Sequence, residues 1–502
     1  MKNNNEPLSS ETVSIQSLLR PALTPVLRNR DHVRIVEDLQ LLDQNLKLSG
    51  LESKAIELAL SELGDKASAA QRSTRAEWAV FSLRSELLRQ MLQAPSFESY
   101  SVTLSSSDLF SDFCGCRSLD GIRWTSKSTL HRASTFYSDE QLREFNTLLV
   151  QTLGGQFSES PLGLETAQDM SVCLIDSTCL EANIHFPVDW VLLRDVSLTL
   201  LKAVTLIRKE GLLCRMPDGP EKFIRDMNKL SIEMTHCYGK TGAKKLRKNV
   251  LRKMKRLLKT IGEHALRHRD KLEMNVGQTK LSQAQATRIV ARIDQKLELL
   301  PKVIEQAHER IIGERPVKSE DKILSAHERE IDIIVRGKAG ARVEFGNELF
   351  IAENAAGIII DYKLYGKGAP SEGLKMQESV ERIAELELAP ELKYVVTDRG
   401  FDGKKHNDFL DKKGITSMVC PKSPARLAER LNEPLFRELQ TRRGATEARI
   451  AIFKNHTGSR VWRAKGLKRR KVAVGWSVLA HNLEWVARTV REQKKEALKK
   501  SA

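Results

Sequence analysis

Cysteine is scarce in this sequence, and the few cysteines are not arranged as a disulfide framework. The 502 residues include 7 cysteines, an odd number that contains no CxxC pair. Cys114 and Cys116 are the only close pair, and ordinary buried thiols explain them. This usage is typical of a protein in a reducing cytosol rather than of a secreted domain.

Long hydrophobic runs are missing as well. The most apolar long segment, WVLLRDVSLTLLKAVTLI from Trp190, is interrupted by Arg194, Asp195 and Lys202, so it cannot span a bilayer. The first ten residues, MKNNNEPLSS, contain no hydrophobic signal core. We therefore expect no membrane partner and a cytoplasmic location.

The sequence also lacks a nucleotide-binding loop and a convincing histidine metal site. Residues 239–242 (GKTG) and 365–368 (YGKG) lack the GxxxxGK[ST] spacing of a phosphate-binding loop, so no nucleotide cofactor is expected. His264 and His268 are four residues apart, as in some metal sites, but they stand in a strongly basic helix that offers no other ligands. We interpret them as surface residues.

Positive charge is abundant, and it is unevenly distributed. Lys and Arg number 82 against 65 Asp and Glu, a net charge of +17. Residues 1–170 carry 17 basic and 22 acidic side chains, whereas residues 171–502 carry 65 and 43. A positive field of this kind favours a polyanionic partner, and nucleic acid fits better than a membrane surface.

The patterning divides the chain into four parts. Residues 1–165 are expected to be mainly helical, and 106–138 could form a helix-turn-helix in which Ser126 caps the second, DNA-reading helix. An ordinary structural helix pair remains an alternative, because such pairs are common and this region is acidic. Residues 187–335 are expected to form a basic helical insertion, and 461–502 a basic helical C-terminal segment.

The remaining segments, 166–186 and 336–460, predict an α/β catalytic core. Their expected order is β, β, β, α, β, α, β, α, which is the order of an RNase H-like mixed sheet flanked by helices. The strand MSVCLID ends at Asp176, and the strand in LKYVVTDRGFDG ends at Asp398. These strands are neighbours in this topology, so both carboxylates should meet at the sheet edge where open α/β folds place their sites. Asp361, in an alternating strand, is expected to face solvent.

A third acid stands on the last core helix. In RRGATEARIAIFK, Arg443, Glu447 and Lys454 are spaced i, i+4 and i+11, which places them within roughly 40° on one helix face. Taken alone, this is also the pattern of a solvated ion-pair stripe. Together with Asp176 and Asp398, however, Glu447 would complete a set of oxygen ligands that suits Mg²⁺ and phosphodiester chemistry.

These motifs together resemble the DDE transposases of bacterial insertion sequences. Thr397-Asp398-Arg399-Gly400-Phe401 is similar to the motif that carries the family's second acid, and Arg443, Glu447 and Lys454 match a Y-x2-R-x3-E-x6-K pattern. Gln440 stands where that pattern has tyrosine. The segment LIDSTCLEANIHFPVDWVLLRD resembles the first-acid region of a branch with a helical insertion after the first catalytic strand. The resemblance runs from about residue 105 to about residue 490.

The resemblance implies a function. The protein would cleave DNA at the ends of its element and transfer the 3′-hydroxyl to target DNA, with Asp176, Asp398 and Glu447 holding Mg²⁺ or Mn²⁺. Arg443, Lys454 and Arg399 would contact DNA. A homodimer on paired ends in the nucleoid is implied. A non-joining nuclease of the same fold and a non-catalytic DNA-binding relic are the alternatives.

The insertion contains the most cationic segment. Between residues 240 and 259, ten of twenty residues are Lys or Arg and none is acidic. Interspersed Leu, Val and Met predict that one face packs on the protein while the basic face points outward. We expect Lys244, Lys248, Arg252 and Lys255 to contact the DNA backbone, although a solubilising face would give the same pattern.

Overall fold

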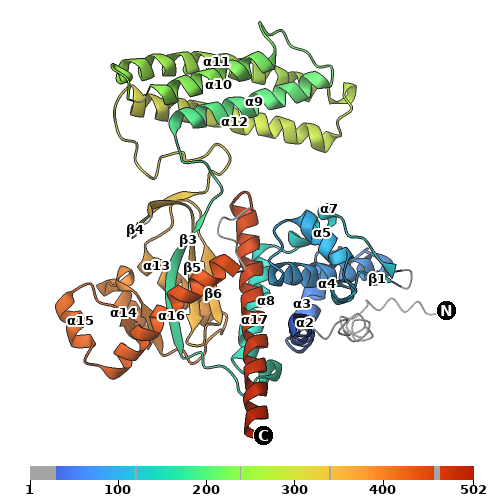
Figure 1. Cartoon of the computed structure of the whole chain (residues 1–502), viewed down its shortest axis with the longest axis vertical. Helices are drawn as coiled ribbons and strands as arrows, with labels where there is room; N and C mark the ends of the chain where they lie inside the picture. Colours follow the sequence, from blue (N-terminus) through green and yellow to red (C-terminus); the bar gives the residue numbers. More distant parts are fainter. Residues whose placement is uncertain (1–29, 119–120, 238, 339–340, 457–463, 502) are drawn as a thin grey trace. The chain divides into compact units, whose positions relative to one another are not determined.

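The structure is a computed structural model, and it describes residues 30–118, 121–237, 239–338, 341–456 and 464–501. The chain divides into two compact units. Unit 1 comprises residues 1–181, 348–365 and 369–502, and unit 2 comprises 182–347 and 366–368. Figure 1 shows the elements along the chain. Among the described residues, no helix is both long and apolar enough to cross a membrane.

Unit 1 is built on a mixed sheet. Its strands are β3 (Val172–Glu181), β5 (Ala341–Asn354), β6 (Ile359–Leu364), β7 (Tyr394–Thr397) and β8 (Thr416–Val419). Strand β3 is central, between β5 and β7. Strands β7 and β8 run parallel to β3, and β6 is antiparallel to β5. The predicted α/β fold, with a central first strand paired to a later parallel strand, is confirmed. The sequence did not predict β4 (Asp332–Lys338), which pairs with the first half of β5 in unit 2.

Helices cover both faces of this sheet because the side chains of β3 alternate between them. Cys173 and Ile175 pack in one apolar cluster with α13 (Glu372–Glu385). Val172 and Leu174 pack in another cluster with α16 (Pro434–His456). The short helix α14 (Lys404–Lys412) lies between β7 and β8, and the short helix α15 (Pro424–Arg430) lies between β8 and α16. Asp176 continues the α16-facing series of β3.

The first and last helical segments of the chain complete unit 1. They are α2 (Arg30–Leu48), α3 (Leu51–Ser61), α4 (Ala69–Met91), α5 (Phe97–Ser105), α6 (Asp108–Cys114), α7 (Lys127–Ser134), α8 (Asp139–Leu153) and α17 (Leu467–Ser501). Helix α17 packs on α8 and α4 and contributes the fully buried Trp476 to the core.

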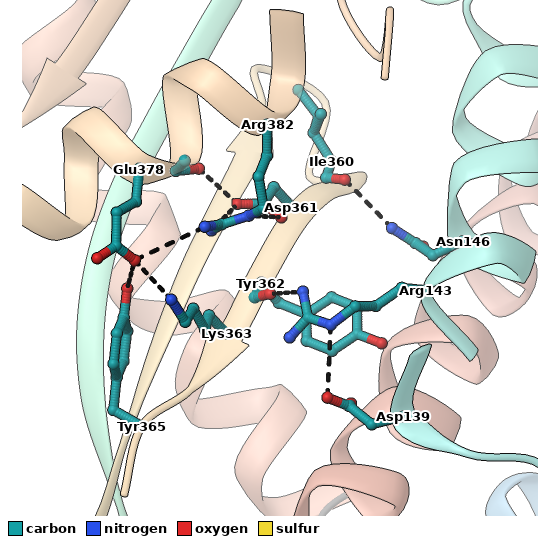
Figure 2. A network of polar contacts seen from close by, with 11 residues as sticks. Asp139, Arg143, Asn146, Ile360, Asp361, Tyr362, Lys363, Tyr365, Glu378 and Arg382 are labelled. Atoms are coloured by element: carbon teal, nitrogen blue, oxygen red, sulfur yellow. Dashed lines mark hydrogen bonds and ion pairs between the residues drawn. The ribbon is translucent and has the colours of Figure 1, made fainter. Parts of the chain in front are cut away.

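Helices α8 and α17 also protect the outer edge of β6. Arg143 donates to the carbonyl of Tyr362 at 2.6 Å, and Asn146 donates to the carbonyl of Ile360 at 3.2 Å (Figure 2). Asn482 of α17 accepts the backbone N–H at the start of the same strand. An open strand edge would expose unpaired backbone groups, so these side chains let the sheet end at β6.

The expected solvent exposure of Asp361 is wrong. Its side chain is buried and accepts the hydroxyl of Ser379 at 2.6 Å. It also pairs with Arg382 at 2.7 Å (Figure 2). The burial of β6 does not alternate, because Ile359 to Tyr362 are all buried. Helix α13 covers the face on which Asp361 lies. A charged side chain tolerates such burial when it is paired and hydrogen-bonded.

The helix-turn-helix predicted near 106–138 has an unusual connection. Ser126 does cap α7, because its hydroxyl accepts the N–H of Thr129 at 3.1 Å. A short antiparallel pair, β1 (Arg117–Ser118) and β2 (Gly121–Ile122), stands between α6 and α7. A helix-turn-helix joins its helices by roughly three or four residues. DNA reading by α7 therefore stays a prediction.

Unit 2 contains a helical bundle with its own apolar core. Its helices are α9 (Asp189–Lys209), α10 (Pro220–His236), α11 (Ala243–Met274) and α12 (Gln283–Ile311), which pack side by side (Figure 1). The interpretation of His264 and His268 as surface residues is wrong, because both are buried in this bundle. Burial lowers the pKa of both imidazoles, and His268 Nδ1 bonds the carbonyl of His264 at 2.7 Å.

A half-buried carboxyl in unit 1 predicts a pH-dependent stability. Glu484 of α17 lines a cavity with Asp38, Arg488 and Arg491. The pKa of Glu484 is raised from 4.5 to about 7, mainly by burial and also by the charge of Asp38, while Arg488 opposes the shift. The folded protein therefore binds this proton more tightly than the unfolded chain. The resulting stability is fully present below pH 4.5 and is lost as the pH rises through about 7.

We expect Glu484→Gln to abolish this loss. Relative to the wild type, the variant should gain up to about 3 kcal/mol of unfolding free energy at about pH 8 and little at about pH 5. Urea unfolding of both proteins at the two pH values measures the difference. A difference that does not change with pH would contradict the assignment to Glu484.

Candidate active site

Asp176 and Asp398 lie beside each other on two neighbouring parallel strands. Asp398 directly follows the end of β7, as predicted. The prediction that the first strand ends at Asp176 is wrong, because β3 continues through this residue to Glu181. Leu174 of β3 pairs with Val396 of β7, and continuing this register by two residues places Asp176 beside Asp398. The two acids are 222 residues apart in the sequence. The sheet thus brings together the two aspartates that the strand-end pattern singled out.

The chain turns sharply after Asp398 because this residue caps the next turn. Its carboxylate accepts the N–H of Gly400 at 2.8 Å and begins the short helix η3 (Arg399–Phe401). A Cβ atom on Gly400 would lie 2.9 Å from the same carboxylate oxygen, so a larger residue would crowd it. The N–H of Ser177 similarly donates to Asp176, at 2.7 Å. One oxygen of each acid is therefore oriented by the backbone.

Helix α16 is anchored at this edge by Gln440. Its amide donates to the carbonyl of Thr397 at 3.1 Å and to the carbonyl of Met418 at 2.6 Å. These two residues lie near the C-terminal ends of β7 and β8. Thr397 directly precedes Asp398. Sequence reasoning treated Gln440 only as a departure from tyrosine and missed this bridge. Its spacing of two helical turns before Glu447 was the available signal.

Helix α16 brings its three predicted site residues to the same region of unit 1. Arg443 Nη1 lies 3.4 Å from Glu447 Oε1, and Lys454 Nζ lies 3.4 Å from the hydroxyl of Thr178 on β3. The Glu447 side chain is 61% exposed, whereas that of Arg443 is 21% exposed. The ion pair expected from the i, i+4 spacing is present. Glu447 remains accessible to an incoming ligand.

The acids influence one another electrostatically. The pKa of Asp176 is raised to about 6, mainly by burial and also by the negative charges of Asp398 and Glu447. The Ser177 N–H and the positive charge of Arg443 act in the opposite direction. The side chains of Asp176, Asp398, Glu447 and Arg443 therefore influence one another's charge. Negative charge concentrated in a half-buried site would be relieved by a bound cation.

The residues fit a hard divalent cation. Carboxylate oxygens are the ligands that Mg²⁺ prefers, and two or three of them leave coordination positions for water and phosphate oxygens. In the described part of the chain, no three His, Cys, Asp or Glu side chains are already gathered around one point. Asp176, Asp398 and Glu447 are the residues that would hold the ion.

The remaining predicted DNA contacts occupy different settings. Arg399 is exposed directly after Asp398. The other four residues belong to α11 in unit 2. Lys244 and Lys248 both pair with Glu314, at 3.0 and 2.9 Å. Arg252 is exposed and hydrogen-bonds Asn249, and Lys255 Nζ lies 3.1 Å from His308.

One comparison with known proteins identifies a related family. Residues 326–483 match the family described as Transposase DDE domain. The matched segment contains Asp398 and Glu447, whereas Asp176 precedes it. No curated protein and no solved structure matches the chain.

Proposed function

Because residues 326–483 match the family described as Transposase DDE domain, we propose that this protein cleaves DNA at the ends of an insertion sequence and joins the freed 3′-hydroxyl to target DNA. The register that sets Asp176 beside Asp398, with Glu447 on the adjoining helix, carries the proposal. These positions supply the donors that phosphodiester chemistry needs at one sheet edge.

The proposed reaction has two steps at phosphorus. Hydrolysis breaks the bond between phosphorus and the 3′-oxygen, water provides the new phosphate oxygen, and the 3′-oxygen leaves with a proton. In strand transfer this 3′-oxygen attacks a target phosphorus and displaces the target's 3′-oxygen. Divalent metal would activate the attacking oxygen and stabilise the leaving one. Asp176, Asp398 and Glu447 would hold it, and Arg443 and Lys454 would bind phosphate oxygens.

Exposed cations at the same edge support a DNA substrate. They stand in the loops and first turns that follow β7 and β8, and they are Arg399, Lys404, Lys405, Lys422 and Arg426. The two loops are tied together, because Lys422 donates its backbone N–H to the Asp402 carboxylate at 2.9 Å. Cations on both loops therefore flank Asp398, where a DNA backbone would pass.

Two DNA ends have to be processed together, so we propose that a homodimer acts when DNA is bound. The partners are the terminal repeats of the element and target DNA, in the cytoplasm at the nucleoid. Mg²⁺ is the proposed metal, and Mn²⁺ would substitute for it. The basic face of α11 would bind the DNA backbone.

Substitutions of the two cations on α16, Arg443 and Lys454, test whether these residues serve catalysis or folding. We expect Arg443→Ala and Lys454→Ala to lower the cleavage rate by about 100-fold to 1,000-fold, because each removes fixed positive charge beside the reacting phosphate. Their melting temperatures should change little. Single-turnover cleavage and thermal melts measure the two effects.

Arg449→Ala is the matched control on the same helix. Arg449 bonds Glu353 at 2.9 Å, and the Glu353 side chain is only 2% exposed. Its loss leaves a buried carboxylate without its cation, which costs about 3 to 5 kcal/mol of stability, while activity per folded molecule should persist. The reverse pattern, in which Arg443→Ala unfolds the protein and leaves its activity normal, would favour a purely structural ion pair.

The function itself is tested with purified protein, Mg²⁺ and DNA that carries the flanking repeats of the element. We expect nicks at the repeat ends and covalent joining of those ends to a second DNA. Cleavage of any sequence without joining would instead identify a non-joining nuclease. Binding without cleavage would identify a non-catalytic DNA-binding protein.

A further inference from the structure

A partly buried polar network lies on the face of strand β3 opposite to Asp176. Asp176 and Ser177 are consecutive, so their side chains point to opposite faces of the sheet. The Ser177 hydroxyl donates to Glu372 Oε2 at 2.8 Å, and the Ser177 N–H donates to Asp176 at 2.7 Å. One serine thus joins Asp176 to the first residue of helix α13.

Glu372 is itself held in place by a buried lysine. Lys375 Nζ lies 3.1 Å from Glu372 Oε1 and 2.6 Å from Glu348 Oε2, and its side chain is 2% exposed. The pKa of Glu348 is raised to about 7, mainly by burial and also by its hydrogen bond with Glu372. The buried Lys375 therefore links two partly exposed carboxylates, and this gives the Glu372 side chain a defined position.

The same turn of α13 also contacts the segment that follows Asp398. The His406 ring, in the first turn of α14, lies directly against Gly373, and a Cβ atom there would overlap the imidazole. His406 Nδ1 lies 3.1 Å from the Gln377 amide. Only glycine permits this close approach. The first turn of α13 therefore contacts segments attached to both aspartates.

We propose that the first turn of α13 positions the two aspartates of the site, acting on Asp176 through Glu372 and Ser177 and on Asp398 through the packing of His406 on Gly373. Glu372 and Ser177 are positioning residues, because neither faces the side of the sheet on which metal and DNA would bind. This inference rests on the proposed function, since it assigns a support to the same metal site.

A positioning role and a merely structural role predict different outcomes. Groups that orient metal ligands typically change metal affinity by about 10-fold to 100-fold when they are removed. A hydrogen bond that only stabilises the fold changes the melting temperature instead. Ser379 offers a matched comparison, because its buried hydroxyl also donates to a carboxylate, that of Asp361, at 2.6 Å. Ser379 lies on α13, as Glu372 does, but its hydroxyl bonds Asp361 and not a residue next to Asp176.

The experiment titrates Mn²⁺ into full-length protein without DNA and follows binding by calorimetry. We expect Ser177→Ala to weaken Mn²⁺ binding by about 10-fold and to raise the Mn²⁺ concentration for half-maximal cleavage in parallel. Ser177→Thr, which keeps the hydroxyl, should restore both quantities. Ser379→Ala should lower the melting temperature about as much as Ser177→Ala while its Mn²⁺ affinity stays at the wild-type value.

Each other outcome has a defined meaning. Folded Ser177→Ala protein with wild-type Mn²⁺ affinity overturns the proposal, as does an equal loss of affinity in Ser379→Ala. If Ser177→Ala does not fold, Glu372→Gln is measured in its place and should also weaken binding. Wild-type protein that binds no Mn²⁺ contradicts the metal site of the proposed function, and this result is distinct from a failure of the support by α13.

Discussion

Replacement of Asp176 or Asp398 by Asn, or of Glu447 by Gln, is expected to lower both cleavage and joining by at least about 1,000-fold. Each change removes a negatively charged oxygen donor while preserving side-chain size. Binding to DNA ends should persist or tighten slightly, because a carboxylate near the phosphates is lost. Gel-shift assays and single-turnover cleavage in Mg²⁺ measure the two properties separately.

Asp402→Asn is the control for this set. Asp402 lies four residues after Asp398, but its carboxylate is hydrogen-bonded by the Lys422 N–H at 2.9 Å and the Asn407 amide at 3.2 Å. It should affect stability and leave metal-dependent cleavage measurable. If Asp176→Asn, Asp398→Asn or Glu447→Gln retains near-normal cleavage in Mg²⁺, that residue does not hold metal.

The second large effect concerns the salt dependence of DNA binding by α11. Each lost phosphate contact should reduce the slope of log affinity against log salt by about 0.9. Changing Lys244, Lys248, Arg252 and Lys255 together to Gln should reduce the slope by roughly two to four units. The lower end is expected, because Glu314 already pairs with Lys244 and Lys248. Specific and random DNA should be affected alike.

A second set of substitutions on α11 tests the face opposite its buried side. Lys245, Arg252, Arg256 and Lys259 are exposed, and their spacing puts them on one stripe, away from the buried residues Val250, Leu251, Met254 and Leu258. Their joint change to Gln should reduce the slope by about three to four units, more than the first set. Unchanged slopes in two folded variants would show that α11 does not bind the DNA backbone.

Much of the fold could be predicted because local hydrophobic patterns indicate the type and order of its elements. The short apolar runs Met170–Asp176 and Tyr394–Asp398, together with the β and α order of the segments, indicated a mixed sheet with a central first strand. The structure and the family match confirm that fold class. The strand β4 was missed because its seven residues, DIIVRGK, offer only a short apolar stretch with no clear alternation.

The errors arose where a pattern does not specify what covers a surface. Asp361 was expected to face solvent on an alternating strand, but β6 is buried on both faces, and α13 covers the face of Asp361 and supplies Arg382. His264 and His268 stand in a basic helix, as predicted, but the bundle buries the side on which they lie. Periodicity predicts which residues share a face. It does not predict whether another element packs on it.

The sequence alone therefore determined the type of core, the three candidate acids, and the preference for a polyanionic partner. Only the tertiary structure decided that Asp176 and Asp398 lie in register, that Gln440 ties α16 to the ends of β7 and β8, and that Glu372 reaches Asp176 through Ser177. The reason is physical. These contacts join segments tens to hundreds of residues apart, and their geometry depends on how whole elements pack, which no local spacing of residues records.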